Sequence, residues 1–390
     1  MNKRRFIRQR GLQTLRQRGL TLIELMVAMT LALAIVGAVT YVYIQGKQGF
    51  SVQDNRSRLQ ENMRLAVSLI SRDLEMGGYF GCLKPIVDTN SGVAISTLRI
   101  TAAQPLMKDD ISDFELDGDQ VNGTRFLSPA MSIRGYDGGA NWPVPSALSS
   151  KLFAGTDTLL ILRGGDDARH LSAPSTSTEF SITSAMTGVT TNGRTPPLVI
   201  SDCTRGELIK PTVRSGGLSF SVDNTLNENT AISDPFKNEL KYPENYTTAA
   251  MVTTFEPVSY YIALAKGKNG VQVPSLHRLV TQTDSTVPAN VGLWKTSGDV
   301  IVEGVERLQV RFYTEGASDG TSAGPFTAAQ VTTAGNWLSL VAVQVELTMV
   351  SDDDSVRTDS TTQTVGGSAV TDKKLRLTTS FSVGVRNPKV

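Results

Sequence analysis

The stretch RGLTLIELMVA, from Arg18 to Ala28, holds a single carboxylate, Glu24, at the start of a long apolar run. From Leu25 to Gly46 the chain has no charged side chain and is dense in Leu, Ile, Val, Ala and Met. A helix of about 20 such residues is long enough to cross a bilayer. Because a membrane offers no favourable place to an unpaired carboxylate, Glu24 either lies at the membrane edge or has a partner.

Basic residues precede the apolar run and predict its orientation. Residues 1–19 contain seven basic side chains and no acidic one, which leaves 31 basic against 37 acidic residues in the rest of the chain. The positive-inside rule keeps residues 1–19 in the cytoplasm and sends the remainder to the other side of the membrane. That remainder is mildly acidic, so we expect no nucleic-acid partner bound through its phosphates.

Two ordinary targeting segments account for part of this pattern. A secretory signal peptide could be cleaved after Ala32-Leu33-Ala34, but the apolar run continues to Ile44 and Glu24 would lie inside the apolar region. A signal anchor explains the arginines and the span, and it leaves Glu24 as an edge residue without a role.

A third interpretation accounts for the whole stretch. Gly19 followed by LTLIE at 20–24 and an uninterrupted apolar span resembles the prepilin leader motif of type IV pilins and type II secretion pseudopilins. That motif has a basic leader, a glycine before the cleavage point and a glutamate at the fifth residue after it. The match departs from major pilins at Leu20, where these most often have Phe.

The resemblance implies a processing event and a role for the carboxylate. Prepilin peptidase would cut between Gly19 and Leu20, and the new amino group of Leu20 would then be methylated. In a dry filament core, this amine of one subunit would meet the Glu24 carboxylate of a neighbour, because a buried charge is costly unless it is paired.

The helical pattern continues beyond the apolar run. Gly77-Gly78 is a plausible stop signal, so we expect one helix over residues 20–76. Residues 20–46 would span the membrane or line a filament core, and the amphipathic residues 47–76 would pack on a sheet. A coiled-coil stalk is the alternative, although the apolar stripe is short for it. The stripe residues, at helical spacing, are Val52, Leu59, Met63, Ala66, Val67, Ile70 and Leu74.

Residues 77–390 have the pattern of a β-rich head. Period-two alternation predicts antiparallel sheet with one buried face. The sequence therefore predicts an α+β, pilin-like fold, in which a long N-terminal helix packs on an antiparallel head with large loop insertions. It leaves open whether the head has one or two subdomains. The expected strands are Thr158–Leu162, Leu198–Ser201, Val258–Leu264, Val300–Tyr313, Val341–Met349 and Leu375–Val385, and the expected loops are 172–195, 281–290, 314–335 and 351–372.

The C-terminal strands deepen the resemblance. The stretches GVERLQVRFYTE, LSLVAVQVELTMVS and FSVGVRNPK resemble the C-terminal half of the PilW family of minor pilins, and RDLEMGGYFGC at 72–82 resembles its helix end and first cysteine. The similarity covers residues 1–82 and 301–390. Type II secretion pseudopilins of the J class share the general plan but have much smaller heads.

The two cysteines, Cys82 and Cys203, have no metal-site spacing. They could pair in an oxidising compartment, or stay as separate thiols in the cytosol. Because the prepilin resemblance places the head outside the cytoplasm, we expect a Cys82–Cys203 disulfide. It would close a loop of about 120 residues and contribute about 4–5 kcal/mol in the chain-entropy account.

The sequence contains no recognisable catalytic motif. It has no nucleophile elbow, P-loop, dinucleotide fingerprint or zincin signature. His170 and His277 belong to no triad or metal motif. Carboxylates at 109–120 imitate the start of a calcium loop, but Thr124 replaces the bidentate glutamate, so a solvated acidic loop is favoured. We therefore expect no enzymatic activity, no cofactor and no metal.

The PilW resemblance implies a minor pilin of a type IV pilus that initiates assembly within a tip or priming complex and supports twitching motility. Its expected partners are prepilin peptidase, other minor pilins, the major pilin and the inner-membrane assembly platform, with a tip adhesin as a further candidate. It would cross the bacterial inner membrane once, with its head in the periplasm, before entering the extracellular pilus. The alternatives are a minor pseudopilin of a type II secretion system and, more distantly, a signal-anchored periplasmic enzyme or ligand-binding protein.

Overall fold

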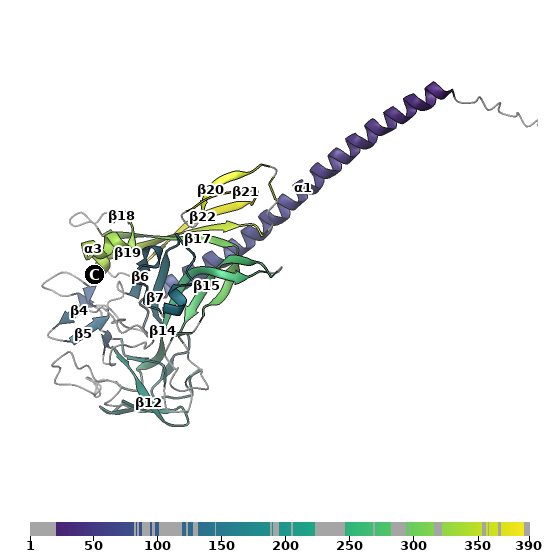
Figure 1. Cartoon of the computed structure of the whole chain (residues 1–390). Coiled ribbons are helices and arrows are strands. Elements are labelled where there is room, and N and C mark those ends of the chain that lie inside the picture. Colours follow the sequence, from purple (N-terminus) through teal and green to yellow (C-terminus); the bar gives the residue numbers. More distant parts are fainter. Residues whose placement is uncertain are drawn as a thin grey trace, which may run out of the picture. The chain divides into compact units, whose positions relative to one another are not determined.

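A computed structural model gives the fold of this chain (Figure 1). The chain forms two compact units, Met1–Asp54 and Asn55–Val390. The structure describes residues 21–81, 83, 86–87, 94–95, 98–100, 119–121, 124–127, 132–144, 146–187, 189, 195–203, 206–222, 246–267, 270–281, 294–295, 297–315, 322–352, 356–357, 359–365 and 368–385.

The N-terminal helix α1 spans Leu22–Glu75, close to the expected 20–76. It ends just before Gly77-Gly78, where the sequence has its stop signal. The chain that leaves the helix pairs at once with strand β7 (Thr158–Gly164). The Gly78 N–H donates to the Leu162 carbonyl at 2.9 Å, and the Gly164 N–H donates to the Tyr79 carbonyl at 2.8 Å. The helix end is therefore joined to the head by backbone hydrogen bonds.

Eleven of the described strands form one large sheet, ordered β16-β15-β14-β10-β11-β3-β5-β4, with β6, β7 and β8 attached through β7 and β14. Its long central strand β14 pairs with β10, β7 and β15 along its length. The pair β11–β3 is parallel, so the head is mostly antiparallel, as the α+β expectation has it, with this one parallel pair among the described strands. The strands of this large sheet are β3 (Leu98–Ile100), β4 (Asp119–Val121), β5 (Thr124–Leu127), β6 (Ile133–Tyr136), β7, β8 (Arg169–His170), β10 (Leu198–Ser201), β11 (Gly206–Ile209), β14 (Met251–Lys266), β15 (Gln272–Val280) and β16 (Asp299–Glu303).

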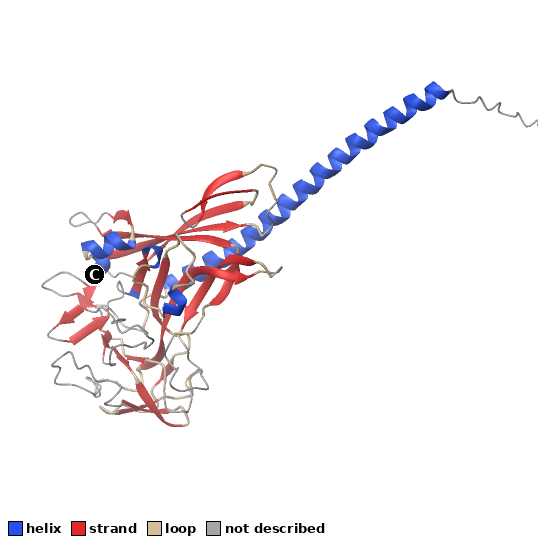
Figure 2. Ribbon diagram, in the orientation of Figure 1, coloured by secondary structure: helices blue, strands red, loops and turns tan. Residues whose placement is uncertain are grey.

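A second, four-stranded antiparallel sheet has the order β18-β17-β19-β22. The smaller sheets are β12-β13-β9 and the two-stranded β1-β2 and β20-β21. Figure 2 shows how strands dominate the head. The strands of the four-stranded sheet and of these smaller sheets are β1 (Ile86–Val87), β2 (Ala94–Ile95), β9 (Glu179–Ser181), β12 (Pro211–Ser215), β13 (Ser219–Val222), β17 (Val305–Glu315), β18 (Ser322–Phe326), β19 (Leu340–Val350), β20 (Thr361–Val365), β21 (Ser368–Asp372) and β22 (Arg376–Gly384). The described helical elements besides α1 are α2 (Ser146–Ser149), α3 (Ala328–Ala334) and the 3-10 turns η2 (Asp137–Gly139) and η5 (Asn336–Ser339).

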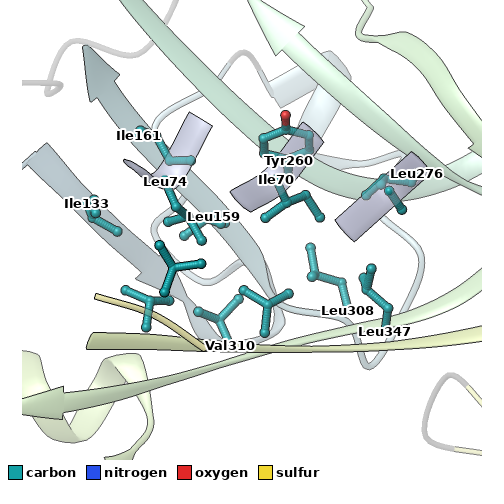
Figure 3. Packing of buried hydrophobic residues seen from close by; sticks show 14 of the residues in the cluster. Ile70, Leu74, Ile133, Leu159, Ile161, Tyr260, Leu276, Leu308, Val310 and Leu347 are labelled. Atoms are coloured by element: carbon teal, nitrogen blue, oxygen red, sulfur yellow. The ribbon is translucent and has the colours of Figure 1, made fainter. Parts of the chain in front are cut away.

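The second half of α1 is the centre of the main hydrophobic core. In Figure 3, Ile70 and Leu74 lie between side chains of the large sheet, such as Tyr260, and side chains of the four-stranded sheet, such as Leu308. The helix therefore contacts two sheets rather than one, and this packing overturns the coiled-coil alternative for this part of the helix. Fully burying such a side chain contributes about 1.5–3 kcal/mol. The buried stripe consists of Leu59, Met63, Ala66, Ile70 and Leu74, with Val67 partly buried beside it.

Two further clusters of buried side chains complete the head. One contains Phe80, Trp142, Tyr261 and Trp294 and includes the side chains of β7, β14 and β15 that point away from α1. The other lies within residues 171–252, around Phe180 and Phe220, whose rings stack at 5.0 Å. This third cluster joins the small sheet β12-β13-β9 to the β10 end of the large sheet. The described residues of the middle region thus have a core of their own.

Several segments differ from the sequence-based expectation. The run expected at Val300–Tyr313 divides at Gly304 into β16 and β17, which belong to different sheets. The segments expected as loops at 172–195, 314–335 and 351–372 contain β9, β18, α3 and the β20-β21 hairpin. These strands have three to five residues each, too few to show a clear period-two pattern. Helix α3 has a capping box, in which Thr327 and Gln330 bond each other's backbone N–H.

Candidate assembly interface

The first half of α1 is apolar around its whole circumference. Every described residue from Thr21 to Phe50 is exposed, and large side chains such as Leu22, Ile23 and Phe50 are each more than 70% exposed. The helix is long and apolar enough to cross a membrane by length and composition. Because a helix that is apolar all round is stable only in lipid or against other protein, this segment needs such surroundings.

Two threonine hydroxyls inside this segment are satisfied within the helix. The Thr30 hydroxyl donates to the Val27 carbonyl at 2.9 Å, and the Thr40 hydroxyl donates to the Val36 carbonyl at 2.8 Å. Such bonds to the preceding turn hide the hydroxyls from the surroundings. The segment can therefore enter a dry environment without leaving these side chains unpaired.

Glu24 lies in the first turn of α1, where a negative charge is favoured by the helix dipole. Its backbone N–H donates to the Thr21 hydroxyl at 3.3 Å, so Thr21 acts as a side-chain cap. The spacing of Thr21 and Glu24 is that of a capping box, of which the structure shows this half. The Glu24 side chain is exposed. Glu24 therefore lies at the solvent-accessible start of the helix, next to the apolar surface.

The other end of α1 is held by an ionic cluster. The Asp73 carboxylate, in the last turn of the helix, is 5% exposed. It accepts a hydrogen bond from the Tyr260 hydroxyl at 2.6 Å and another from the Arg278 Nε at 2.8 Å. The Arg163 Nε lies 3.6 Å from its other oxygen. Strands β7, β14 and β15 each supply one of these three partners.

The cluster contacts α1 at a second residue, Arg72. Arg163 also pairs with Glu256 and with Asp166, each at 3.1 Å, and Asp166 pairs with Arg72 of α1 at 3.2 Å. Together with Asp73 and Arg278, the cluster has three acidic and three basic side chains, so its formal charges balance. Buried ion pairs are tolerated when the charges are matched and hydrogen-bonded in this way.

The pKa values of two members follow from their surroundings. Burial raises the pKa of Tyr260 well above its ordinary value, and the neighbouring Asp73 carboxylate raises it further. Burial lowers the pKa of Arg278, but its bonds to Asp73 outweigh this effect, and the net pKa is raised. Tyr260 therefore stays a neutral donor and Arg278 a cation across the physiological pH range.

The residues that the sequence singles out are only partly within the described chain. Gly19, Leu20 and Cys82 lie outside it, as do residues 109–118 of the acidic loop. Cys203 is described, exposed and disulfide-bonded. Its expected pairing with Cys82 stays a prediction.

The two histidines occupy different environments. His170 is exposed on β8. His277 is buried on β15, stacked on Tyr261 at 5.0 Å, and its Nδ1 lies 3.3 Å from the Gly298 carbonyl. Within the described ranges, no three His, Cys, Asp or Glu side chains are grouped so that they could hold a metal ion.

Sequence reasoning missed the cluster around Asp73. One signal was available, because Asp73 follows Ile70 by three residues and so lies on the apolar face of α1. A carboxylate on a buried face predicts a partner. The identity of the partners could not be predicted, because Arg163, Tyr260 and Arg278 are distant in sequence.

Comparison with known families gives two matches. Residues 259–387 match the family described as Type IV Pilus-assembly protein W, and residues 14–40 match the Prokaryotic N-terminal methylation motif. The first match runs from the middle of β14 to the end of the four-stranded sheet, and the second includes Gly19, Leu20 and Glu24. No curated protein and no solved structure matches the chain.

These matches agree with the architecture. The long apolar helix and the mostly antiparallel head give an α+β fold with a pilin-like N-terminal helix, and the methylation motif supports a membrane-anchored pilin. Both matches agree with the resemblance to PilW-family pilins that the sequence predicted.

Proposed function

We propose that this chain is a minor pilin that helps to initiate assembly of a type IV pilus. Prepilin peptidase removes residues 1–19, the amine of Leu20 is methylated, and the head faces the periplasm until the subunit enters the filament. There it joins other minor pilins in a complex that primes filament growth and sits at the tip. The proposal includes a structural rather than an enzymatic role.

The observation that carries this proposal is that the two halves of α1 differ in their exposed apolar surface. The half with the methylation motif is apolar all round and exposed, whereas the half beyond it has a narrow stripe buried in the head. A membrane anchor alone requires the first half but not a carboxylate in its first turn. A subunit that passes from lipid into a helical filament core uses both, because Glu24 can pair with the Leu20 amine of a neighbour.

The experiment replaces Glu24 by Ala in cells that assemble pili. Cleavage of the leader should continue, while the amount of this subunit in sheared pili should fall at least about tenfold, the effect of losing about 1.4 kcal/mol of docking energy. Glu61→Ala is the matched control, because Glu61 is an exposed acidic residue of the same helix outside the apolar half. Normal incorporation of the Glu24→Ala protein would contradict the proposal.

Two alternatives are separated by the same strains. A minor pseudopilin of a type II secretion system would also depend on Glu24, but its loss would block protein secretion and leave twitching motility intact. A signal-anchored periplasmic enzyme or binding protein would tolerate Glu24→Ala, because an anchor does not use the carboxylate.

A further inference from the structure

We infer that Asp73 is a positioning residue that fixes the axial register of α1 within the head. The inference rests on the proposed function only for its biological meaning, namely that a pulled filament loads the joint between helix and head. All the residues involved lie within 55–390.

An apolar stripe specifies which face of a helix is buried, but it specifies its axial position weakly. If α1 moved toward its N-terminus by four residues, four of the five stripe sites would still receive an apolar side chain, and the site of Leu74 would receive Gly78. Only the site of Ala66 would be overfilled, by Ile70. The incoming residues would be Met63, Val67, Ile70 and Leu74.

The ionic cluster does not tolerate such a shift. Four residues correspond to about 6 Å along the axis, which would separate the Asp73 carboxylate from the Tyr260 hydroxyl and from both arginines. Arg163, whose side chain is 6% exposed, would keep its acidic partners on β14 and at Asp166 but lose the one on the helix. A single buried polar position sets the register of coiled coils in the same way, since only one alignment satisfies it.

A second observation shows that this alignment matters. Gly77 approaches Ile133 of β6 so closely that an added Cβ would lie 2.9 Å from two carbons of its side chain. A Cβ at that distance would force its neighbour to move. The site of Gly77 therefore has little room for a side chain, so a four-residue shift toward the C-terminus, which would bring Asp73 to this site, is disfavoured.

The cluster is also placed where an axial load would act. Asp73 and Arg72 are in the last turn of α1, and their partners lie on strands β7 and β15 and on the segment that follows β7. Load on the helix would pass to several strands of the large sheet at once. The backbone bonds of Gly78 and Tyr79 hold the chain after the helix, so they resist a shift only if the last turn does not unwind.

The test measures the axial position directly in the full chain in detergent micelles. Spin labels are attached through ketone-bearing residues at Gln60 of α1 and Ser380 of β22, both exposed, so neither cysteine is modified. In the wild type, electron-electron double resonance should give one narrow distance distribution. In Asp73→Asn, we expect a second population displaced by about 5–6 Å, which corresponds to one helical turn.

The control is Glu75→Gln, which removes an exposed carboxylate two residues farther along the helix and should keep the single distance. Arg278→Gln is the second variant in case Asp73→Asn does not fold. The Arg278→Gln protein keeps the bond from Tyr260 to Asp73 and the Arg163–Asp73 pair. We expect this variant to broaden the distribution of distances between the two spin labels.

A single, unshifted distance in folded Asp73→Asn or Arg278→Gln would overturn the inference, even if the melting temperature fell. That outcome would assign the cluster to stability alone. The assay involves neither the peptidase nor a filament, so a negative result would leave the proposed function standing. A negative result of the Glu24 experiment would likewise leave the role of Asp73 standing.

Discussion

Single buried residues tie distant parts of the head together. Arg376, at the start of β22, forms two forked ion pairs. Its Nε and Nη2 contact Glu306 at 2.7 and 2.9 Å, and its Nη1 and Nη2 contact Asp372 at 2.6 and 2.7 Å. The Arg376 side chain is only 5% exposed. One guanidinium thus joins β17, β22 and the end of the β20-β21 hairpin.

Replacing Arg376 by Gln should lower the free energy of unfolding by about 3–5 kcal/mol, because it leaves two carboxylates poorly paired in a mostly buried site. Hydrogen bonds from Arg376 are also the main reason that the pKa of Asp372 is lowered. Urea unfolding followed by tryptophan fluorescence measures the loss.

The control is Arg214→Gln, because Arg214 pairs with Glu179 at 2.9 Å on the surface, with both side chains about half exposed. Such a pair contributes only about 0–1 kcal/mol. Equal effects of the two substitutions would contradict the role given to Arg376.

His277 should make the stability of the head depend on pH. Burial lowers its pKa below the ordinary 6.5, although contacts with Gly298, Ala263 and Asp299 raise it in part. Between the folded pKa and 6.5 the unfolded chain binds the proton and the folded chain does not. The free energy of unfolding should therefore fall as the pH drops below 6.5, by at most about 1.4 kcal/mol per pH unit.

Urea midpoints at pH 7.5, 6.5 and 5.5 test this dependence. His277→Phe keeps a ring against Tyr261 and should flatten the profile, whereas His170→Gln should not, since His170 is exposed. An unchanged profile in His277→Phe would show that another group carries the pH dependence.

At the scale of elements, the connection between the two main sheets depends on Gly304. Its φ is 75°, a left-handed conformation, and an added Cβ would lie 2.7 Å from the Val350 carbonyl oxygen. Its N–H donates to the Pro274 carbonyl of the large sheet, and its carbonyl accepts from Val350 of the four-stranded sheet. The chain therefore changes sheets at this residue.

Gly304→Ala should cost about 2–3 kcal/mol, because it combines the left-handed penalty with a backbone clash. Gly335→Ala isolates the first contribution, since Gly335 has a φ of 68° but open space around its Cβ position. We expect about 1–2 kcal/mol there. Chemical denaturation of both variants provides the comparison, and a smaller loss for Gly304→Ala would contradict the argument.

The elements that the sequence predicted best are those with strong periodicity. Helix α1 and strands β19 and β22 lie where apolar spacing predicted them, because their sequence alternates between buried and exposed faces. Strands β7, β10 and β14 coincide with short apolar runs. The break at Gly304 was missed because apolar residues lie on both sides of it, although only the second half of the run alternates. Helix α3 was missed because it has only seven residues, although its capping box was a usable local signal.

For the whole molecule, the sequence indicated the order of parts but not their packing. It predicted an apolar helix followed by a β-rich head, and it left the number of subdomains open. The placement of α1 between two sheets, and the separate cluster within residues 171–252, depend on pairing between distant segments. The partners of Asp73 could not be predicted for the same reason, since three strands far apart in the chain supply them.

The measurement that tests the account most directly is the intact mass and N-terminal residue of the protein from cells with and without prepilin peptidase. We expect an N-methylated Leu20 as the first residue only when the peptidase is present. A chain that starts near Met1 in both strains would contradict it. The protein would then be anchored in the membrane without entering a filament, and its head would have to be studied for a ligand instead.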